Sequence, residues 1–122
     1  MRAILIEPSD RFISETEVPE FTADIRRRFG GARLVRVATL PSGDGVYVVD
    51  SGDAHNSFTL GGAGPFHGLG LILGKHGHLG QLKGARTDFD ALASIVTFWP
   101  IATGKYVIER VREDDGADGA AG

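Results

Sequence analysis

Residues Leu60–Gly74 read L-G-G-A-G-P-F-H-G-L-G-L-I-L-G, and six of these fifteen residues are glycine. Glycine serves where the backbone takes a positive φ or where another group approaches it closely. The apolar run Leu69–Leu73 at the end of the stretch predicts a buried strand. The whole chain has 18 glycines in 122 residues, about twice the average share of ~7%. We therefore expect many tight turns and bulges, as in a β-rich fold.

The segments on either side of this stretch predict more short strands and two helices. Phe21, Ile25 and Phe29 are spaced as one stripe of a helix, with Thr22 as its N-cap. A second helix is expected to begin at Thr87, again with the threonine as cap, while residues 95–98 suit either a helix or a strand. Strands are expected at Arg2–Glu7, Phe12–Val18, Ala32–Leu40, Val46–Asp50, Phe58–Leu60, Leu69–Leu73, Leu79–Leu82 and Tyr106–Arg112.

These elements predict one small α+β domain, because a chain of this length forms a single core. The expected architecture is a mixed, mostly antiparallel sheet of five to eight short strands with two helices packed on one face. We expect the domain to span residues 1–112. Residues 113–122 read E-D-D-G-A-D-G-A-A-G and are expected to form a disordered acidic tail, since they have nothing to bury.

Charge and composition exclude several classes of protein. The net charge is −3, and four of the 16 acidic residues lie in the last ten positions, so the rest of the chain is nearly neutral. A nucleic-acid-binding protein needs a basic surface, so nucleic acid is not an expected partner. The chain has no cysteine, which excludes disulfides and thiolate zinc sites. No apolar run approaches the roughly 20 residues that cross a bilayer, and we expect a cytoplasmic protein.

The glycine-rich stretch does not match the known nucleotide-binding motifs. A dinucleotide fingerprint needs G-x-G-x-x-G before a helix, whereas a strand is expected here. The alternative is a nest of backbone N–H groups that binds a nucleotide or another anion; its residues would be Gly62, Gly64, His67, Gly68 and Lys75. We favour a structural role in which glycines permit close packing, and we expect Gly70→Val to be severely destabilising.

The histidines raise the alternative of a metal-dependent hydrolase. His76 and His78 point to the same side in an extended backbone, and His67 is a third candidate ligand. No acidic residue stands beside the pair to orient it. Exposed histidines in a turn are the favoured interpretation, and we expect no metal or other cofactor. Ser51, Asp53, His55 and Ser57 also lack the G-x-S-x-G motif of a nucleophilic serine.

One cationic cluster, Arg26–Arg28, lies at the predicted end of the first helix. Cations are favourable there because they face the negative end of the helix dipole. The functional alternative is a surface that binds a partner. Exposed aromatic residues often anchor such surfaces, and Phe66 is a candidate.

The order of three segments resembles a known family. These are M-R-A-I-L-I-E-P at the start, L-P-S-G-D-G-V-Y-V-V-D in the centre, and F-T-L-G-G-A-G-P-F-H-G-L-G-L-I-L-G after it. In this order they resemble the DUF3846 family of small bacterial, plasmid and phage proteins, a domain of unknown function. The likeness covers most of Met1–Trp99 and carries no catalytic residues. It implies a small accessory protein, often encoded on a mobile element.

Together these observations predict a binding protein rather than an enzyme. It would belong to a mobile element or its host, and would act on a host component, such as part of a defence system, or by self-association. Nucleotide or anion binding and metal-dependent hydrolysis are the two alternatives.

Overall fold

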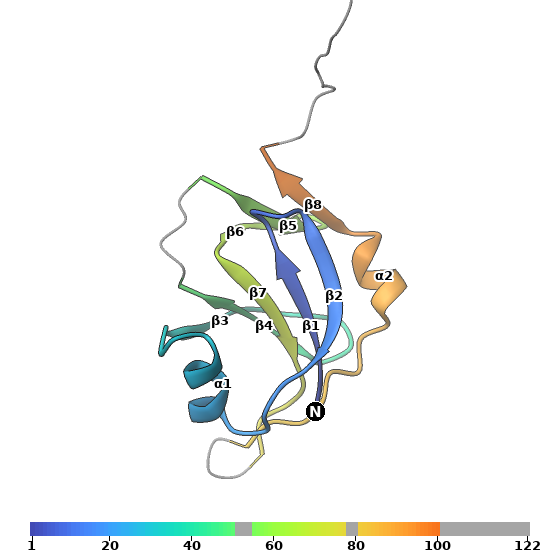
Figure 1. Cartoon of the computed structure of the whole chain (residues 1–122). Coiled ribbons are helices and arrows are strands. Elements are labelled where there is room, and N and C mark those ends of the chain that lie inside the picture. Colours follow the sequence, from blue (N-terminus) through green and yellow to red (C-terminus); the bar gives the residue numbers. More distant parts are fainter. Residues whose placement is uncertain (51–54, 78–80, 101–122) are drawn as a thin grey trace, which may run out of the picture.

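The computed structural model describes residues 1–50, 55–77 and 81–100. They form two antiparallel sheets and two short helices (Figure 1). In chain order the elements are β1 (Arg2–Glu7), β2 (Phe12–Glu17), α1 (Thr22–Arg28), β3 (Leu34–Thr39), β4 (Gly45–Val49), β5 (Ser57–Leu60), β6 (Ala63–His67), β7 (Leu69–Leu73), α2 (Phe89–Ala93) and β8 (Val96–Trp99).

The larger sheet has five strands in the order β2-β1-β7-β4-β3, and the smaller has three in the order β6-β5-β8. Every neighbouring pair is antiparallel. The apolar strand β7 lies at the centre of the larger sheet, between β1 and β4. The predicted α+β class is confirmed, but the strands are divided between two sheets.

The core lies on both faces of the larger sheet. On one face Ile4 and Ile72 pack in a cluster with Phe58 of the smaller sheet and Leu92 of α2. On the other face Leu71 packs in a cluster with Ile25 of α1. The helices therefore lie on opposite faces of the larger sheet, not on one face as expected. Each helix is short and buries one side chain, so the smaller sheet covers most of the first face.

The glycine-rich stretch forms the β5–β6 hairpin and the connection into β7. Gly64 and Gly68 have φ of 109° and 97°, a region that favours glycine. Gly68 alone joins β6 of the smaller sheet to β7 of the larger sheet. At Gly70 a Cβ would lie 2.6 Å from Cζ of Phe58. The expected close approach is therefore confirmed at Gly70.

Both helix caps differ from the expectation. The N-cap of α1 is Phe21, without a side-chain hydrogen bond, and Thr22 is the first helical residue. The cap of α2 is Asp88, whose carboxylate accepts from the N–H of Ala91. Thr87 does not cap α2, because its hydroxyl donates to Asp44.

Three further expectations concern the second half of the chain. Of residues 95–98, which suit either a helix or a strand by sequence, residues 96–98 lie in strand β8 (Val96–Trp99) and Ile95 directly precedes it. Of the expected strand Leu79–Leu82, Leu82 forms an isolated bridge with His76, while residues 79 and 80 lie outside the described residues. The expected strand Tyr106–Arg112 and the acidic tail also lie outside them. Across the described ranges, neither helix has the length and apolar character needed to span a bilayer.

Candidate functional site

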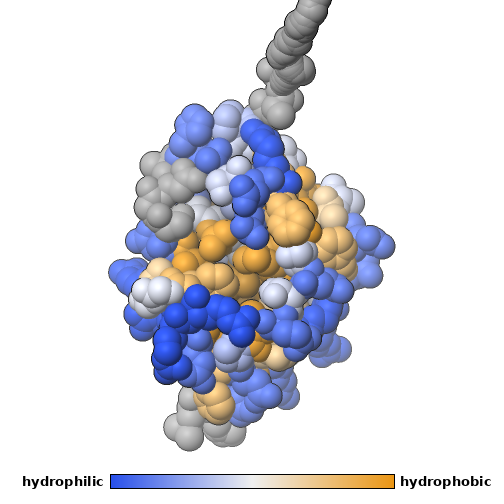
Figure 2. Space-filling model, in the orientation of Figure 1, coloured by the Kyte–Doolittle hydropathy of each residue, from blue (hydrophilic) through white to orange (hydrophobic). Residues whose placement is uncertain are grey.

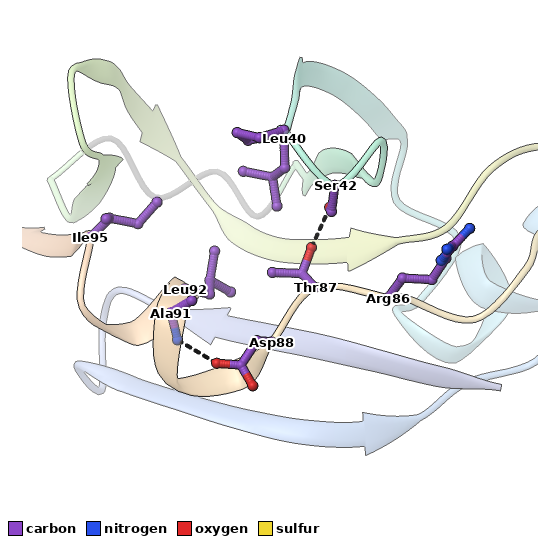
Figure 3. Close-up of a pocket in the computed structure, with 9 residues that line it drawn as sticks. Leu40, Ser42, Arg86, Thr87, Asp88, Ala91, Leu92 and Ile95 are labelled. Carbon is purple, nitrogen blue, oxygen red and sulfur yellow. Dashed lines mark hydrogen bonds between the residues drawn. The ribbon is translucent and has the colours of Figure 1, made fainter.

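A pocket of about 270 Å³ lies between the turn that follows β3 and the first turn of α2 (Figure 3). One segment supplies residues 40–42, and the other supplies residues from 86 to 95. The apolar lining residues are Leu40, Pro41, Ala91, Leu92 and Ile95, and the polar ones are Ser42, Arg86, Thr87 and Asp88.

A buried carboxylate holds the two walls of this pocket together. Asp44 is 1% exposed, and its Oδ2 accepts hydrogen bonds from the N–H of Arg86 at 2.8 Å and the N–H of Thr87 at 2.7 Å. The hydroxyl of Thr87 donates to the same oxygen at 2.6 Å. A carboxylate is stable in such a place only when hydrogen bonds compensate for its lost hydration. Asp44 thus fixes the start of α2 against the β3–β4 turn.

The two hydroxyl groups at the pocket are engaged within the protein. A hydroxyl has one hydrogen to donate, and Thr87 donates its hydrogen to Oδ2 of Asp44. Ser42 is then the donor in its 2.7 Å contact with Oγ1 of Thr87. Oγ of Ser42 also accepts from the N–H of Asp44 at 3.3 Å. A nucleophilic hydroxyl needs a base to remove its proton, and a threonine hydroxyl is not such a base. This arrangement positions the pocket walls.

The apolar side chains of the pocket converge on one space. Leu40, Leu92 and Ile95 point toward one another from the β3–β4 turn, from α2 and from the residue before β8 (Figure 3). Leu92 is buried, whereas Ile95 is 40% exposed. The volume of about 270 Å³ lies just below the ~300–1,000 Å³ typical of sites for drug-sized ligands. The pocket therefore has room for a large apolar side chain.

The residues predicted to bind an anion do not form one cluster. Gly62 lies in the turn of the β5–β6 hairpin and Gly64 lies in β6. His67 is the last residue of β6, and Gly68 joins β6 to β7. Lys75 follows the opposite end of β7, about 20 Å away along an extended strand. It lies instead near Gly43, where a Cβ would be 3.5 Å from Cε of the lysine.

The candidate metal ligands are also separated. His67 pairs with Ser57 in the smaller sheet, whereas the ring of His76 lies edge-on to Tyr47, with centroids 6.3 Å apart. His78 lies outside the described residues, as do Ser51 and Asp53. Within the described part of the chain, no three His, Cys, Asp or Glu residues are arranged to hold a metal ion.

The arginines of α1 and Phe66 do not share a surface. Phe66 packs against Phe58 at a ring-centroid distance of 5.5 Å, on the face of the larger sheet opposite α1. The three guanidinium groups are exposed and bond to their own chain: Arg26 to the carbonyls of Gly31 and Ala32, Arg27 to Asp24, and Arg28 to the carbonyl of Glu17.

Sequence reasoning missed the pocket beside α2. Residues 41–45, P-S-G-D-G, are typical of a turn, and residues 87–90, T-D-F-D, are typical of a helix start, but both patterns are local. The contact that joins them links Asp44 to Thr87, 43 residues apart. No local pattern signals a pairing over that separation.

Known proteins give no further guidance, because no protein-family model, curated protein or solved structure matches the chain. The resemblance to the DUF3846 family remains a prediction from the three segments that suggested it.

Proposed function

We propose that this chain is a non-enzymatic binding protein, an accessory protein of a mobile element or its host. Its partner is a protein segment that inserts one apolar side chain into the pocket beside α2. The observation that carries this proposal is the pocket itself, with apolar walls, charged residues of opposite sign in its lining and a volume of about 270 Å³, which has room for one large apolar side chain. The mobile-element context rests on the resemblance to the DUF3846 family.

The energetics of such a pocket favour an anchoring role. Full burial of one large apolar side chain contributes about 1.5–3 kcal/mol, and a few anchors of this kind dominate most protein interfaces. Arg86 and Asp88 are exposed at the rim, where their charges would orient a partner. The hydrogen bonds of Asp44 hold the walls in place before binding, which lowers the entropic cost of association.

The hydroxyl groups support binding over catalysis. Ser42 donates to Thr87, and Thr87 donates to Asp44. Both protons are therefore directed into the protein, away from a bound group. The pocket supplies shape and apolar surface to its occupant.

We expect Ala91→Phe to abolish binding, because Ala91 is exposed and lines the pocket. Peptides selected on the parent protein from a random phage-displayed library are the probe. Fluorescence polarisation should show at least a tenfold loss of affinity for Ala91→Phe, since the new ring occupies the space of the anchor. Ser94→Phe is the matched control, because Ser94 is exposed at the end of α2 but does not line the pocket. It should bind like the parent.

The same experiment separates the alternatives. Selected peptides that bind Ala91→Phe as tightly as the parent would rule out the pocket as the site. A dimer that dissociates in Ala91→Phe, measured by light scattering, would identify a second copy of the chain as the partner. Stabilisation by nucleotides or phosphate in a thermal-shift panel, following RT ln(1 + [L]/Kd), would favour the anion-binding alternative.

A further inference from the structure

The face of the larger sheet that carries α1 is only partly covered. We call it the open face and define it by four residues: Leu5 of β1, Phe12 of β2, Leu34 of β3 and Leu69 of β7. Leu5, Leu34 and Leu69 pack on the cluster under α1 but are only half-buried, and Phe12 is 50% exposed. Figure 2 shows this face as an apolar area surrounded by hydrophilic residues. Contiguous exposed apolar areas of this kind mark sites of interaction.

The described part of the chain ends near the β1–β2 turn, at one edge of this face. Arg11, in the turn between β1 and β2, donates from Nη2 to the carbonyl oxygen of Pro100. Arg11 directly precedes Phe12, one of the four residues of the open face. The last 22 residues of the chain therefore begin next to its edge.

The composition of those residues complements the face. Residues 106–111 read Y-V-I-E-R-V, four of which are apolar, and residues 113–115 are E-D-D. The exposed arginines of α1, Arg26–Arg28, lie at the end of the sheet opposite the β1–β2 turn (Figure 1). Five residues connect Pro100 to Tyr106, and the six residues 106–111 span about 20 Å when extended, roughly the length of β7. The apolar stretch can thus cover the face while the acids reach the arginines.

We propose that the segment Tyr106–Asp115 docks on the open face of the same molecule. Its apolar side chains lie over Leu5, Leu34 and Leu69, and its acids lie beside the arginines of α1. A tethered segment has an effective concentration in the millimolar range, so it outcompetes a second copy of the chain at ordinary protein concentrations. This contact does not depend on the pocket beside α2.

The absence of cysteine in the chain allows a direct test with a nitroxide attached at Glu109→Cys in the full-length protein. The NMR methyl signals of Leu5, Leu34 and Leu69 should lose more than half of their intensity. Those of Leu60 and Leu92, which belong to the cluster on the opposite face, should keep theirs. Adding Ile108→Asp to the labelled chain should restore the signals and raise the fluorescence of an added apolar dye.

Two results would overturn the proposal. One is equal broadening, or none, on the two faces of the sheet. The other is broadening of the open face only when labelled chains are mixed with unlabelled isotope-enriched chains, because that pattern places a second copy on the face. The pocket variants Ala91→Phe and Ser94→Phe should leave the broadening unchanged, so failure here is distinguishable from failure of the pocket.

Discussion

Asp44→Ala is expected to lower the free energy of unfolding by about 3 kcal/mol. The substitution removes the acceptor of two backbone N–H groups and one hydroxyl. A buried donor left without a partner costs about 1–3 kcal/mol, and the three losses are partly offset because the carboxylate no longer has to be desolvated. Urea unfolding, followed by the fluorescence of Trp99, the single tryptophan, measures the change.

The control for this variant is an aspartate that makes a single bond at the surface. Asp88 is exposed and caps α2 through the N–H of Ala91. Loss of such a cap costs about 1 kcal/mol. Asp88→Ala is therefore the control variant. Asp44→Asn keeps one acceptor oxygen, and its free energy of unfolding should lie between those of Asp44→Ala and Asp88→Ala. If Asp44→Ala is no less stable than Asp88→Ala, Asp44 does not join the β3–β4 turn to α2 in the way described.

The second large effect is expected for Gly70→Val, with a loss of at least about 3 kcal/mol. A Cβ at this position would lie 2.6 Å from Cζ of Phe58 and 3.2 Å from Cβ of Ile6. Both neighbours are fully buried, so neither can move aside without opening the contact between the two sheets. The melting temperature, measured by circular dichroism, should fall accordingly.

Another glycine of the same stretch provides the control. At Gly62 a Cβ would meet no atom within 4 Å, and φ is not in the positive region. Gly62→Val should therefore stay within about 0.5–1 kcal/mol of the parent. In the double variant Gly70→Ala, Phe58→Leu, a smaller side chain replaces the ring that the new Cβ would meet. This variant should recover part of the stability lost in Gly70→Ala, because the two positions are in contact. A Gly70→Val protein that melts like the parent would contradict the close approach.

The strands of the larger sheet were predictable, because their patterns are local. Leu69–Leu73 is continuously apolar, as expected of a strand buried on both faces, and residues 3–6 show the same character. The positions of the helices were not predictable. One buried side chain, Ile25 in α1 and Leu92 in α2, fixes each helix to the larger sheet. The sequence of a helix does not indicate which face of the sheet it will cover.

The candidate site was less predictable than the fold. Thr87 has the sequence context of a helix cap, but its hydroxyl donates a hydrogen bond to Asp44. Asp88 caps the helix instead. Similarly, Lys75 follows the glycine-rich stretch in sequence, yet the length of β7 separates it from Gly68. Nearness in sequence gives the wrong distance whenever an extended strand lies between two residues.

The single residue between β6 and β7, Gly68, has a consequence for cooperativity. The β5–β6 hairpin of the smaller sheet continues directly into β7, the central strand of the larger sheet. Neither sheet can therefore separate from the other without disturbing the strand to which it is joined. We expect the amides of β5 and β7 to exchange with solvent deuterium at the same slow rate, through one global opening event. Mass spectrometry of exchanged peptides measures this, and faster exchange in β5 would show that the smaller sheet opens by itself.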